Sequence, residues 1–342
     1  MSVEQKSLKQ IMDHRLEKLN SLIKDGVDPY PAKFKPTHFS QSIKLNYEEL
    51  KGKNVVVAGR IRALRKMGKA SFFRISDNEG DIQIFIKKDD LGDVIYGYFK
   101  LLDIGDFVGI EGSVFTTKTG EISIHTANLT ILAKSIRPLQ IVKEKDGVWY
   151  DSFSDKEQRY RNRHLDLLLN PEVKKTFFKR AKIIKCIRKF LDDKQFLEVE
   201  TPVLQPLYGG ANARPFVTHH NTLDQTLYMR IADELYLKRL IIGGIDRVYE
   251  IGKDFRNEGM DRNHNPEFTM LEFYCAYMDY EDCMDLVENL IKNAAKEVNA
   301  LVINIDGREV DLNMTFHRKK FMELLTEKLG YDFNDISEDQ LK

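Results

Sequence analysis

The residues best suited to chemistry lie in two neighbouring segments, 248–256 and 268–275, whose composition predicts β-strands. Both carry β-branched and aromatic residues, and a polar segment rich in asparagine, with glycine and proline, separates them. Strand side chains alternate between two faces. One side presents Asp254, Arg256 and Glu258 from the first strand, and Phe268, Met270, Glu272 and Tyr274 from the second. Such a set suits a ligand that is anionic at one end and cationic elsewhere, although a solvated strand pair with incidental ion pairs fits the same pattern.

The residues between and within these strands resemble a known motif. FRNEG at 255–259, followed by RNHNPEFTMLEFY at 262–274, resembles motif 2 of the class II aminoacyl-tRNA synthetases. The match is to the form of the motif that lysyl-tRNA synthetases carry. Because the string is long and unusual, the resemblance is specific, and it implies an enzyme that joins an amino acid to tRNA using ATP.

The composition of the chain narrows the kinds of protein it can be. With 342 residues it is long enough for about two domains with separate cores. The 53 basic and 53 acidic side chains balance, so nucleic-acid binding requires a local basic patch. The three cysteines form no CxxC pair, which fits a reducing compartment. We find no secretion signal and no apolar run of about 18 residues, so we expect a soluble, cytoplasmic protein that does not enter a membrane.

The first part of the chain predicts a helix followed by a small β-barrel. Apolar residues recur at helical spacing over residues 4–25, and this helix either packs on its own domain or serves as an RNA-binding arm. From 54 to 133, alternating segments predict five strands with a helix near 91–102, which favours an OB-fold. Residues 51–74 hold eight basic and no acidic side chains. Basic and aromatic groups on such a barrel bind single-stranded nucleic acid, although an ordinary half-exposed sheet fits the alternation too.

Two strings of the barrel segment, GRIRALRKMGKASFFRISD and TKTGEISIH, resemble the anticodon-binding domain of the lysyl enzymes. The resemblance implies that Phe72 stacks on an anticodon base and that Arg65 lies near the RNA. It also implies that Gln83 and Glu121 form hydrogen bonds with base edges. A carboxylate repels phosphates, so Glu121 helps only by accepting from base donors. The implied partner is tRNA(Lys), with its uridine-rich anticodon.

The segment after the barrel predicts a junction and a dimer contact. The basic cluster of Arg159, Arg161 and Arg163 is typical of a solvated surface between domains. Asn170 followed by a proline predicts the start of a long helix, with the asparagine as its N-cap and the proline at the first helical position. Residues 196–204 predict the strand after it. This helix and strand resemble class II motif 1, marked by Pro202 at the strand, which implies a homodimer; a core helix in a monomer is the alternative.

The resemblance assigns four residues to the substrate lysine. They are Gly210, Glu234, Glu272 and Tyr274. In the family the Gly210 carbonyl and the Glu234 carboxylate face the α-amino group, and Tyr274 forms a hydrogen bond with the ε-amino group. Glu272 supplies negative charge near the substrate. A buried ammonium requires a carboxylate partner, so an acid-rich pocket is what lysine demands.

Four residues are assigned in the same way to ATP, and these are Arg256, Glu258, His264 and Phe268. Arg256 is the implied catalytic residue, since a guanidinium can bridge the lysine carboxylate and the α-phosphate. Phe268 would stack under the adenine, and His264 would meet the outer phosphates. Glu258 would orient either the adenine or the tRNA terminus. The reaction makes lysyl-adenylate from L-lysine and ATP, and then lysyl-tRNA.

We therefore expect an α+β protein with a five-stranded OB-fold barrel and a partial class II antiparallel β-sheet core flanked by helices. The expected domains are a helical extension (1–50), the anticodon-binding domain (51–140), a linker (141–165), the partial catalytic core (166–300) and the start of an insertion (301–342). The resemblance ends near residue 300, ahead of the family's motif 3 and Mg²⁺ ligands. We thus expect no metal ligands in this chain, and the properties of a fragment that is inactive or weakly active.

Two other functions remain open from the sequence. Aspartyl- and asparaginyl-tRNA synthetases share both domains, but they should offer cations to an acidic side chain, whereas Glu234, Glu272 and Tyr274 suit an amine. A non-catalytic tRNA-binding paralogue is the other alternative. The presence of Arg256 and Phe268 weighs against it, and the absence of a motif 3 weighs for it.

Overall fold

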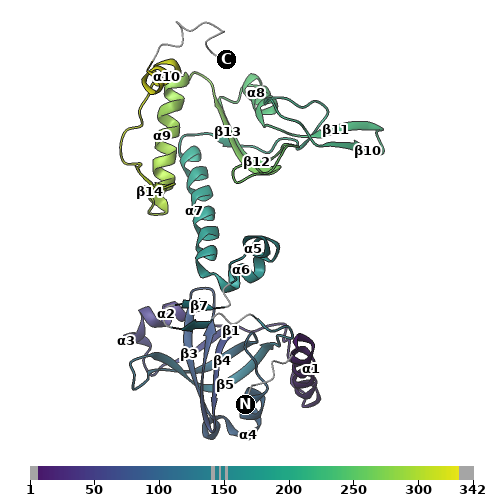
Figure 1. The fold of residues 1–342 in the computed structure, drawn as a ribbon, viewed down its shortest axis with the longest axis vertical. Helices are drawn as coiled ribbons and strands as arrows, with labels where there is room; N and C mark the ends of the chain where they lie inside the picture. The colour runs from purple at the N-terminus through teal and green to yellow at the C-terminus, as the bar shows by residue number, and fades with distance from the viewer. Residues whose placement is uncertain (1–6, 140–142, 146–147, 151–152, 331–342) are drawn as a thin grey trace. The chain divides into compact units, whose positions relative to one another are not determined.

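The protein folds into two units, each with its own hydrophobic core (Figure 1). The computed structural model describes residues 7–139, 143–145, 148–150 and 153–330. Contacts within the chain divide it at Asp155, into Met1–Asp155 and Lys156–Lys342. None of the described helices is long and apolar enough to cross a membrane.

The first unit is built on a closed five-stranded barrel, as the alternation predicted. Its strands are β1 (Asn54–Met67), β2 (Ala70–Ser76), β3 (Asp81–Lys87), β4 (Phe107–Thr116) and β5 (Ile122–Ala133). They close in the order β1-β2-β3-β5-β4, with β3 and β5 parallel and the other neighbours antiparallel. Helix α4 (Lys88–Lys100) connects β3 to β4. This arrangement confirms the predicted OB-fold.

The barrel closes because every second side chain of its strands enters one core. Val55, Val57, Gly59 and Ile61 of β1 are all buried, and the residues between them are more exposed. Gly59 has no side chain for a steric reason, since a Cβ there would lie 2.7 Å from the Ser76 carbonyl oxygen. Only glycine allows the neighbouring strand to approach this closely.

The N-terminal helix belongs to this unit. Helix α1 (Leu8–Lys24) places Leu22 in the barrel core. The Arg15 guanidinium donates to the carbonyl oxygens of Ser135 at 2.7 Å and Ile104 at 3.1 Å. Of the two roles left open for this helix, packing on its own domain is the one these contacts support. The short helices α2 (Ser40–Leu45) and α3 (Tyr47–Leu50) precede β1.

One prediction about the junction is wrong and one is confirmed. After the hairpin β6 (Lys143–Lys145) and β7 (Val148–Tyr150), the second unit begins with helices α5 (Lys156–Arg161) and α6 (Arg163–Leu169). Arg159 and Arg163 are not a purely solvated surface, because both pair with the buried carboxylate of Asp166. The next helix begins at Pro171 with Asn170 at its N-cap position, as predicted, although the Asn170 side chain donates to Asp166 at 2.7 Å and makes no capping hydrogen bond.

The second unit contains two small sheets that meet near the predicted site. One has the order β13-β12-β8 and the other β10-β11-β9. Their strands are β8 (Leu197–Glu198), β9 (Leu204–Gln205), β10 (Val217–His220), β11 (Gln225–Met229), β12 (Arg247–Phe255) and β13 (Glu267–Cys275). The single strand predicted over 196–204 is therefore wrong. Its two ends belong to different sheets, and Pro202, which has no N–H to donate, lies in the segment between them.

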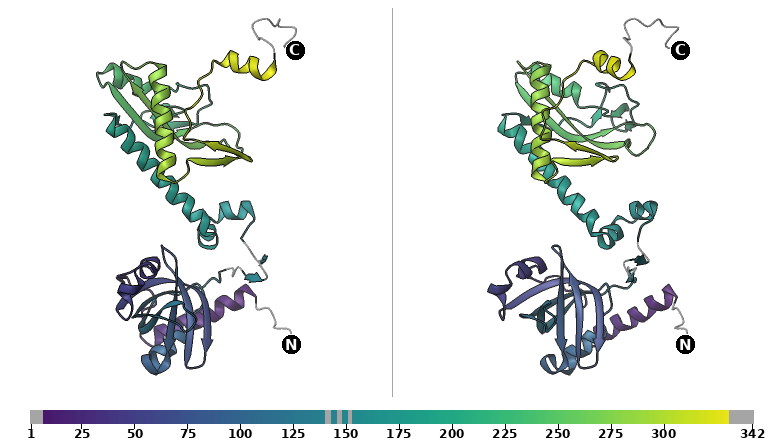
Figure 2. Two further views of the ribbon diagram at one scale, coloured as in Figure 1. Left: turned by 90° about the vertical axis from the view of Figure 1, so that its left-hand side faces the viewer. Right: turned by 60° about the vertical axis from the view of Figure 1, so that its left-hand side comes forward.

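Helices cover one side of the β12–β13 sheet (Figures 1 and 2). Helix α7 (Pro171–Asp193) packs against α9 (Tyr280–Glu297). Leu191 of α7 and Leu286 and Leu290 of α9 bury the Tyr249 ring of β12. Helix α8 (Glu234–Ile242) contacts β12 and β13 as well. The remaining elements are the hairpin β14 (Val302–Ile305) and β15 (Arg308–Asp311) and helix α10 (Phe321–Leu329); the sequence had not predicted β15.

Candidate nucleic-acid interface and candidate active site

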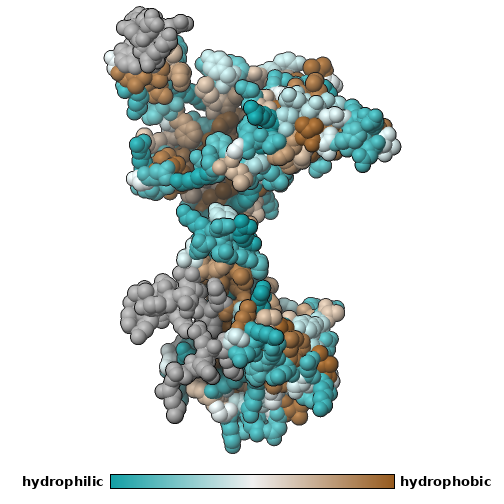
Figure 3. Space-filling model, turned by 45° about the vertical axis from the view of Figure 1, so that its right-hand side comes forward, coloured by the Kyte–Doolittle hydropathy of each residue, from teal (hydrophilic) through white to brown (hydrophobic). Residues whose placement is uncertain are grey.

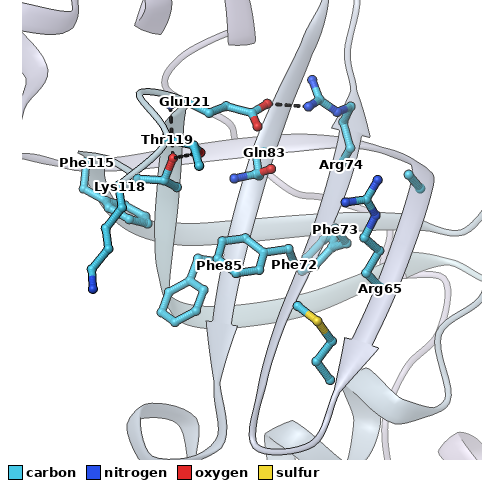
Figure 4. A pocket seen from close by; sticks show the side chains of 13 residues that line it. Arg65, Phe72, Phe73, Arg74, Gln83, Phe85, Phe115, Lys118, Thr119 and Glu121 are labelled. Atoms are coloured by element: carbon cyan, nitrogen blue, oxygen red, sulfur yellow. Dashed lines mark hydrogen bonds and ion pairs between the residues drawn. The ribbon is translucent and has the colours of Figure 1, made fainter.

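A pocket of about 660 Å³ opens on the outer surface of the barrel (Figure 4). All four residues assigned to the anticodon line it, namely Arg65, Phe72, Gln83 and Glu121. Strand pairing explains why they meet. Arg65 of β1 lies opposite Phe72 of β2, and Arg74, two residues after Phe72 and on the same face, lies opposite Gln83 of β3.

Aromatic rings form the floor of this pocket. The Phe72 and Phe85 rings lie 4.9 Å apart, tilted by 41°. Phe85 continues to Phe115, with ring centres 6.0 Å apart and an edge-to-face contact. Sequence reasoning missed Phe85 and Phe115. Alternation could have found Phe85, because it lies two residues after Gln83 on the same strand face.

Polar groups form the opposite side of the pocket and are held in place by one another. The Glu121 carboxylate pairs with the Arg74 guanidinium, and Gln83 lies between this pair and the aromatic rings in Figure 4. The Gln83 amide donates to the Ser123 hydroxyl at 3.0 Å, which donates to the Glu121 carbonyl oxygen at 3.2 Å. An aromatic surface beside a fixed amide and a fixed carboxylate can stack a base and form hydrogen bonds with its edge.

The second site lies on one face of the β12–β13 pair. The register places Asp254 opposite Phe268 and Glu250 opposite Glu272. The side chains that strand alternation assigned to one side of each segment therefore share a face of the pair. The guanidinium of Arg256, just beyond β12, lies 5.1 Å from the centre of the Phe268 ring. Its Nε donates to the Ile231 carbonyl oxygen, at 3.4 Å. The Arg and the aromatic ring assigned to ATP thus lie in direct contact.

The loop residues assigned to ATP lie at the edge of this face. The Glu258 carboxylate accepts from the Arg214 backbone N–H at 3.3 Å, and the Asn257 N–H donates to the Arg214 carbonyl oxygen at 2.7 Å. These bonds join the loop after β12 to the segment that follows Gly210. His264 is exposed, and its ring contacts the Asp261 carboxylate at 2.7 Å. Within the described residues, His264 pairs with Asp261 and makes no hydrogen bond or ion pair with Arg256.

The four residues assigned to lysine lie around the start of α8. A Cβ on Gly210 would lie 2.8 Å from the Glu234 Cβ, and its φ of +87° also favours glycine. The Tyr274 hydroxyl donates to Glu272 at 3.1 Å. Burial, together with the charges of Glu272 and Glu234, raises the pKa of Tyr274, which stays a neutral donor. Two carboxylates, a phenol and a close-packed glycine make an anionic cluster suited to an amine.

A cation of the chain itself already contacts this anionic cluster. The Lys238 ammonium, one turn along α8, lies 2.5 Å from the Glu234 carboxylate and 5.8 Å from the centre of the Tyr274 ring. Both partners attract positive charge. An incoming amine therefore has to displace or rearrange this contact.

Beneath the face lies a buried charged layer that sequence reasoning largely missed. Arg230 is 2% exposed and forms ion pairs with Glu250, Asp233 and Asp254. A Cβ on Gly252 would lie 1.9 Å from an Arg230 nitrogen, so glycine at this position makes room for the guanidinium. Of these residues only Asp254 had been noted. The available signal was the run of charged residues inside otherwise apolar strands.

The residues assigned to a dimer contact are accessible. Pro202 lies between β8 and β9, and its carbonyl oxygen accepts from the Gln205 side chain at 2.9 Å. On α7, Phe177 and Phe178 are each 50% exposed. Hydrophobic areas interrupt the hydrophilic surface of this unit in Figure 3. An exposed aromatic pair on a long helix is consistent with an interface.

Comparison with known proteins gives consistent matches for both units. Residues 155–342 match the family model of class II tRNA synthetases (D, K and N), and residues 55–139 match the OB-fold nucleic acid binding domain. The chain is 49% identical to a lysine–tRNA ligase of Clostridium novyi over 332 residues, 96% of this chain and 64% of that protein. It is 49% identical to one of Carboxydothermus hydrogenoformans over 337 residues (98% and 68%), and 48% identical to one of Syntrophomonas wolfei over 341 residues (99% and 68%). The chain thus spans about two thirds of the length of the curated relatives it matches.

Proposed function

The chain belongs to the lysine–tRNA ligase family of class II tRNA synthetases, and we propose on this basis that it activates L-lysine with ATP and transfers it to tRNA(Lys). The observation that carries the proposal is the anionic cluster of Glu272 and Tyr274, on β13, and Glu234, on α8, beside the strand pair that leads to Arg256. Aspartate and asparagine also carry an α-ammonium, but their side chains, one anionic and one neutral, bring no second positive charge to the carboxylates.

In the proposed complex the pocket binds both amines of lysine. Glu272 and Tyr274 receive the ε-ammonium, and Glu234 receives the α-ammonium beside the Gly210 backbone. The Tyr274 hydroxyl keeps one Glu272 oxygen in place at 3.1 Å, and the Asp233 N–H keeps the other at 3.3 Å. A prearranged carboxylate stabilises an ammonium without first having to lose hydrogen bonds to water.

The proposed activation step needs no nucleophile from the protein. A carboxylate oxygen of lysine attacks the α-phosphorus, an O–P bond forms, and the bond to the leaving pyrophosphate breaks. Arg256 neutralises charge shared between carboxylate and phosphate, and Phe268, 5.1 Å from it, supports the adenine. Glu258 orients the adenine or the tRNA terminus, and His264 meets the outer phosphates once its loop closes.

Magnesium, which accompanies ATP in such reactions, has no fitting site among the residues that the structure describes. Three carboxylates lie together there, those of Asp233, Asp254 and Glu272. Asp233 and Asp254 are fully buried, and both lie against the Arg230 guanidinium, which already supplies a positive charge. We therefore assign no step to a metal held by these residues.

The barrel pocket supplies the proposed tRNA contact. Phe72 stacks on an unpaired anticodon base, Gln83 and Glu121 contact its edge, and Arg65 lies near the backbone. Glu121 is held by Arg74, so its net effect on nearby phosphates is reduced. We further propose that α7 and the segment at Pro202 form a homodimer contact, and that the protein acts in the cytoplasm.

Equilibrium binding of amino acids tests the proposal directly. Calorimetric titration should detect binding of L-lysine and no comparable binding of L-aspartate or L-asparagine. Glu272→Gln should weaken lysine binding, because a neutral amide removes a charge partner worth about 1.5–3 kcal/mol, or roughly 10–150-fold. Tyr277→Phe, at an exposed ring, serves as the matched control. Stronger binding of aspartate than of lysine by the folded protein would refute the assignment.

A further inference from the structure

The charged layer beneath the proposed lysine pocket contains more carboxylates than cations. Within the described residues, the side chains of Asp233, Asp254 and Glu250 are 0%, 0% and 4% exposed, and Arg230 is the single basic group buried among them. The proposed reaction assigns no ligand contact to the carboxylates of Asp233 and Asp254. Their placement, at the start of α8 and near the end of β12, sets them directly behind Glu272.

Glu250 and Arg230 satisfy each other. An Arg230 nitrogen lies 2.6 Å from the Glu250 carboxylate, which also accepts from the Thr201 hydroxyl at 2.6 Å and the Thr201 N–H at 3.2 Å. The guanidinium further donates to the Lys253 carbonyl oxygen at 3.0 Å. This pair is neutral overall and is held by three further groups, the Thr201 hydroxyl, the Thr201 N–H and the Lys253 carbonyl oxygen. It leaves the charges of Asp233 and Asp254 without a cation of their own.

Asp233 and Asp254 lack the hydrogen bonds that buried carboxylates normally have. Each lies within ion-pair distance of Arg230, at 3.0 and 3.2 Å. Yet none of their four oxygens accepts a hydrogen bond with good geometry from the described part of the chain. When two carboxylates are buried this close together, the state in which both are ionised is energetically unfavourable. A proton between them removes one charge and supplies one hydrogen bond.

The surroundings of the pair agree with a shared proton. Burial first, and then the charge of Asp254, raise the pKa of Asp233 to about 8, and burial also raises the pKa of Asp254. The charged groups that face the pair are Arg230 after β11, Glu250 on β12, Glu272 on β13 and Arg256 after β12. Together with Asp233 and Asp254 themselves, the cluster contains four acids and two cations, so it favours one more positive charge.

We propose that Asp233 and Asp254 share one proton in the free protein and release it when the ε-ammonium of lysine binds at Glu272. This rests on the proposed lysine site, because Glu272 connects the two: its carboxylate accepts the Asp233 N–H at 3.3 Å, and its oxygen lies within 4.8 Å of both partners. An ammonium and a proton compete to neutralise the same cluster. Asp233 and Asp254 are then positioning residues that set the charge behind the pocket.

The amount of proton release follows from this geometry. An opposite charge at about 4–6 Å lowers a carboxyl pKa by roughly 1–3. Starting from a pKa of about 8, the pair would release between about half a proton and one proton on lysine binding near pH 7. Lysine affinity should therefore rise with pH by up to about tenfold per pH unit between the bound and free pKa values.

Calorimetry in buffers of different ionisation enthalpy measures this release. For the full chain, the observed enthalpy of L-lysine binding plotted against buffer ionisation enthalpy should have the slope of a released proton. Asp254→Asn should bind lysine with a slope near zero, because the amide donates to Asp233 and leaves no shared proton. Asp224→Asn, an equal charge change at an exposed turn, should keep the wild-type slope. Lysine binding without proton release in the wild-type protein would overturn the proposal.

A measurement without lysine separates this proposal from the proposed function. Infrared difference spectra between about pH 6 and about pH 10 should show the loss of one buried carboxylic acid band, absent in Asp254→Asn and in Asp233→Asn. If the band is present but lysine does not bind, the proposed function fails and the coupling fails with it. If lysine binds and the band is absent, only the shared proton is refuted. The two aspartate variants also guard against one of them failing to fold.

Discussion

Replacing Phe72 by alanine is the sharpest test of the barrel pocket. The ring lies on the outer face, half-buried against Phe85 at 4.9 Å, so its removal takes away one side of the stacking surface without opening the barrel core. Stacking on an aromatic ring contributes roughly 1–3 kcal/mol per base. We therefore expect Phe72→Ala to weaken binding of a tRNA(Lys) anticodon stem–loop by about 5–150-fold. Phe72→Trp should bind as tightly as the wild type.

Fluorescence anisotropy with a labelled stem–loop measures this change, and salt dependence identifies its cause. Loss of stacking should leave the slope of log Kd against log salt unchanged, because no phosphate contact is removed. Arg65→Gln should instead reduce the slope by up to about 1 if that side chain contacts a phosphate. The adjacent Phe73 is a matched contrast: it is 2% exposed, so Phe73→Ala should destabilise the barrel by about 3–5 kcal/mol. Wild-type affinity in a folded Phe72→Ala protein would refute the stacking role.

Three further changes test the second unit. Tyr274→Phe removes the hydroxyl that holds Glu272, so calorimetry should show lysine binding weakened by roughly 10–150-fold, with an unchanged fold by circular dichroism. Gly252→Ala drives a Cβ against the Arg230 guanidinium, and urea unfolding should show a loss of about 3–5 kcal/mol; Gly259→Ala, with nothing within 4 Å, should change stability little. The raised pKa of the aspartate pair means that the folded state keeps a proton that the unfolded chain loses. Wild-type stability should then fall between about pH 4 and pH 8 by up to about 1.4 kcal/mol per pH unit, and Asp254→Asn should flatten that fall; identical slopes would contradict the shared proton.

The parts of the fold that were predictable are those that local sequence determines. Alternation predicted β1 because Val55, Val57 and Ile61 each enter one core, and the same period placed Arg256 and Phe268 on a common face. These features need only neighbouring residues and the geometry of a strand. The aromatic floor at Phe85 lay within reach of the same reasoning.

The failures involve partners that are distant in sequence. The chain leaves one sheet and enters another between 198 and 204, where the Thr201 N–H and hydroxyl both donate to Glu250. Nothing near Thr201 in sequence indicates a partner 49 residues away. Asn170 is a different case: it occupies the predicted N-cap position, but its side chain donates to Asp166, four residues earlier, and makes no capping hydrogen bond. Such choices depend on which buried charge lies nearby in space.

Both proposed sites contain carboxylates although a phosphate-bearing ligand binds nearby, and in both an arginine lies against at least one of these carboxylates. Arg74 pairs with Glu121 at the barrel pocket, and Arg230 lies against Asp233 and Asp254 beneath the lysine pocket. An isolated carboxylate would repel RNA or ATP from these surfaces. An adjacent guanidinium cancels that repulsion at a distance but leaves carboxylate oxygens free to accept from a correctly placed donor. Selectivity for a base edge or an ammonium then comes from contact geometry, while the net charge of each site stays compatible with a polyanion.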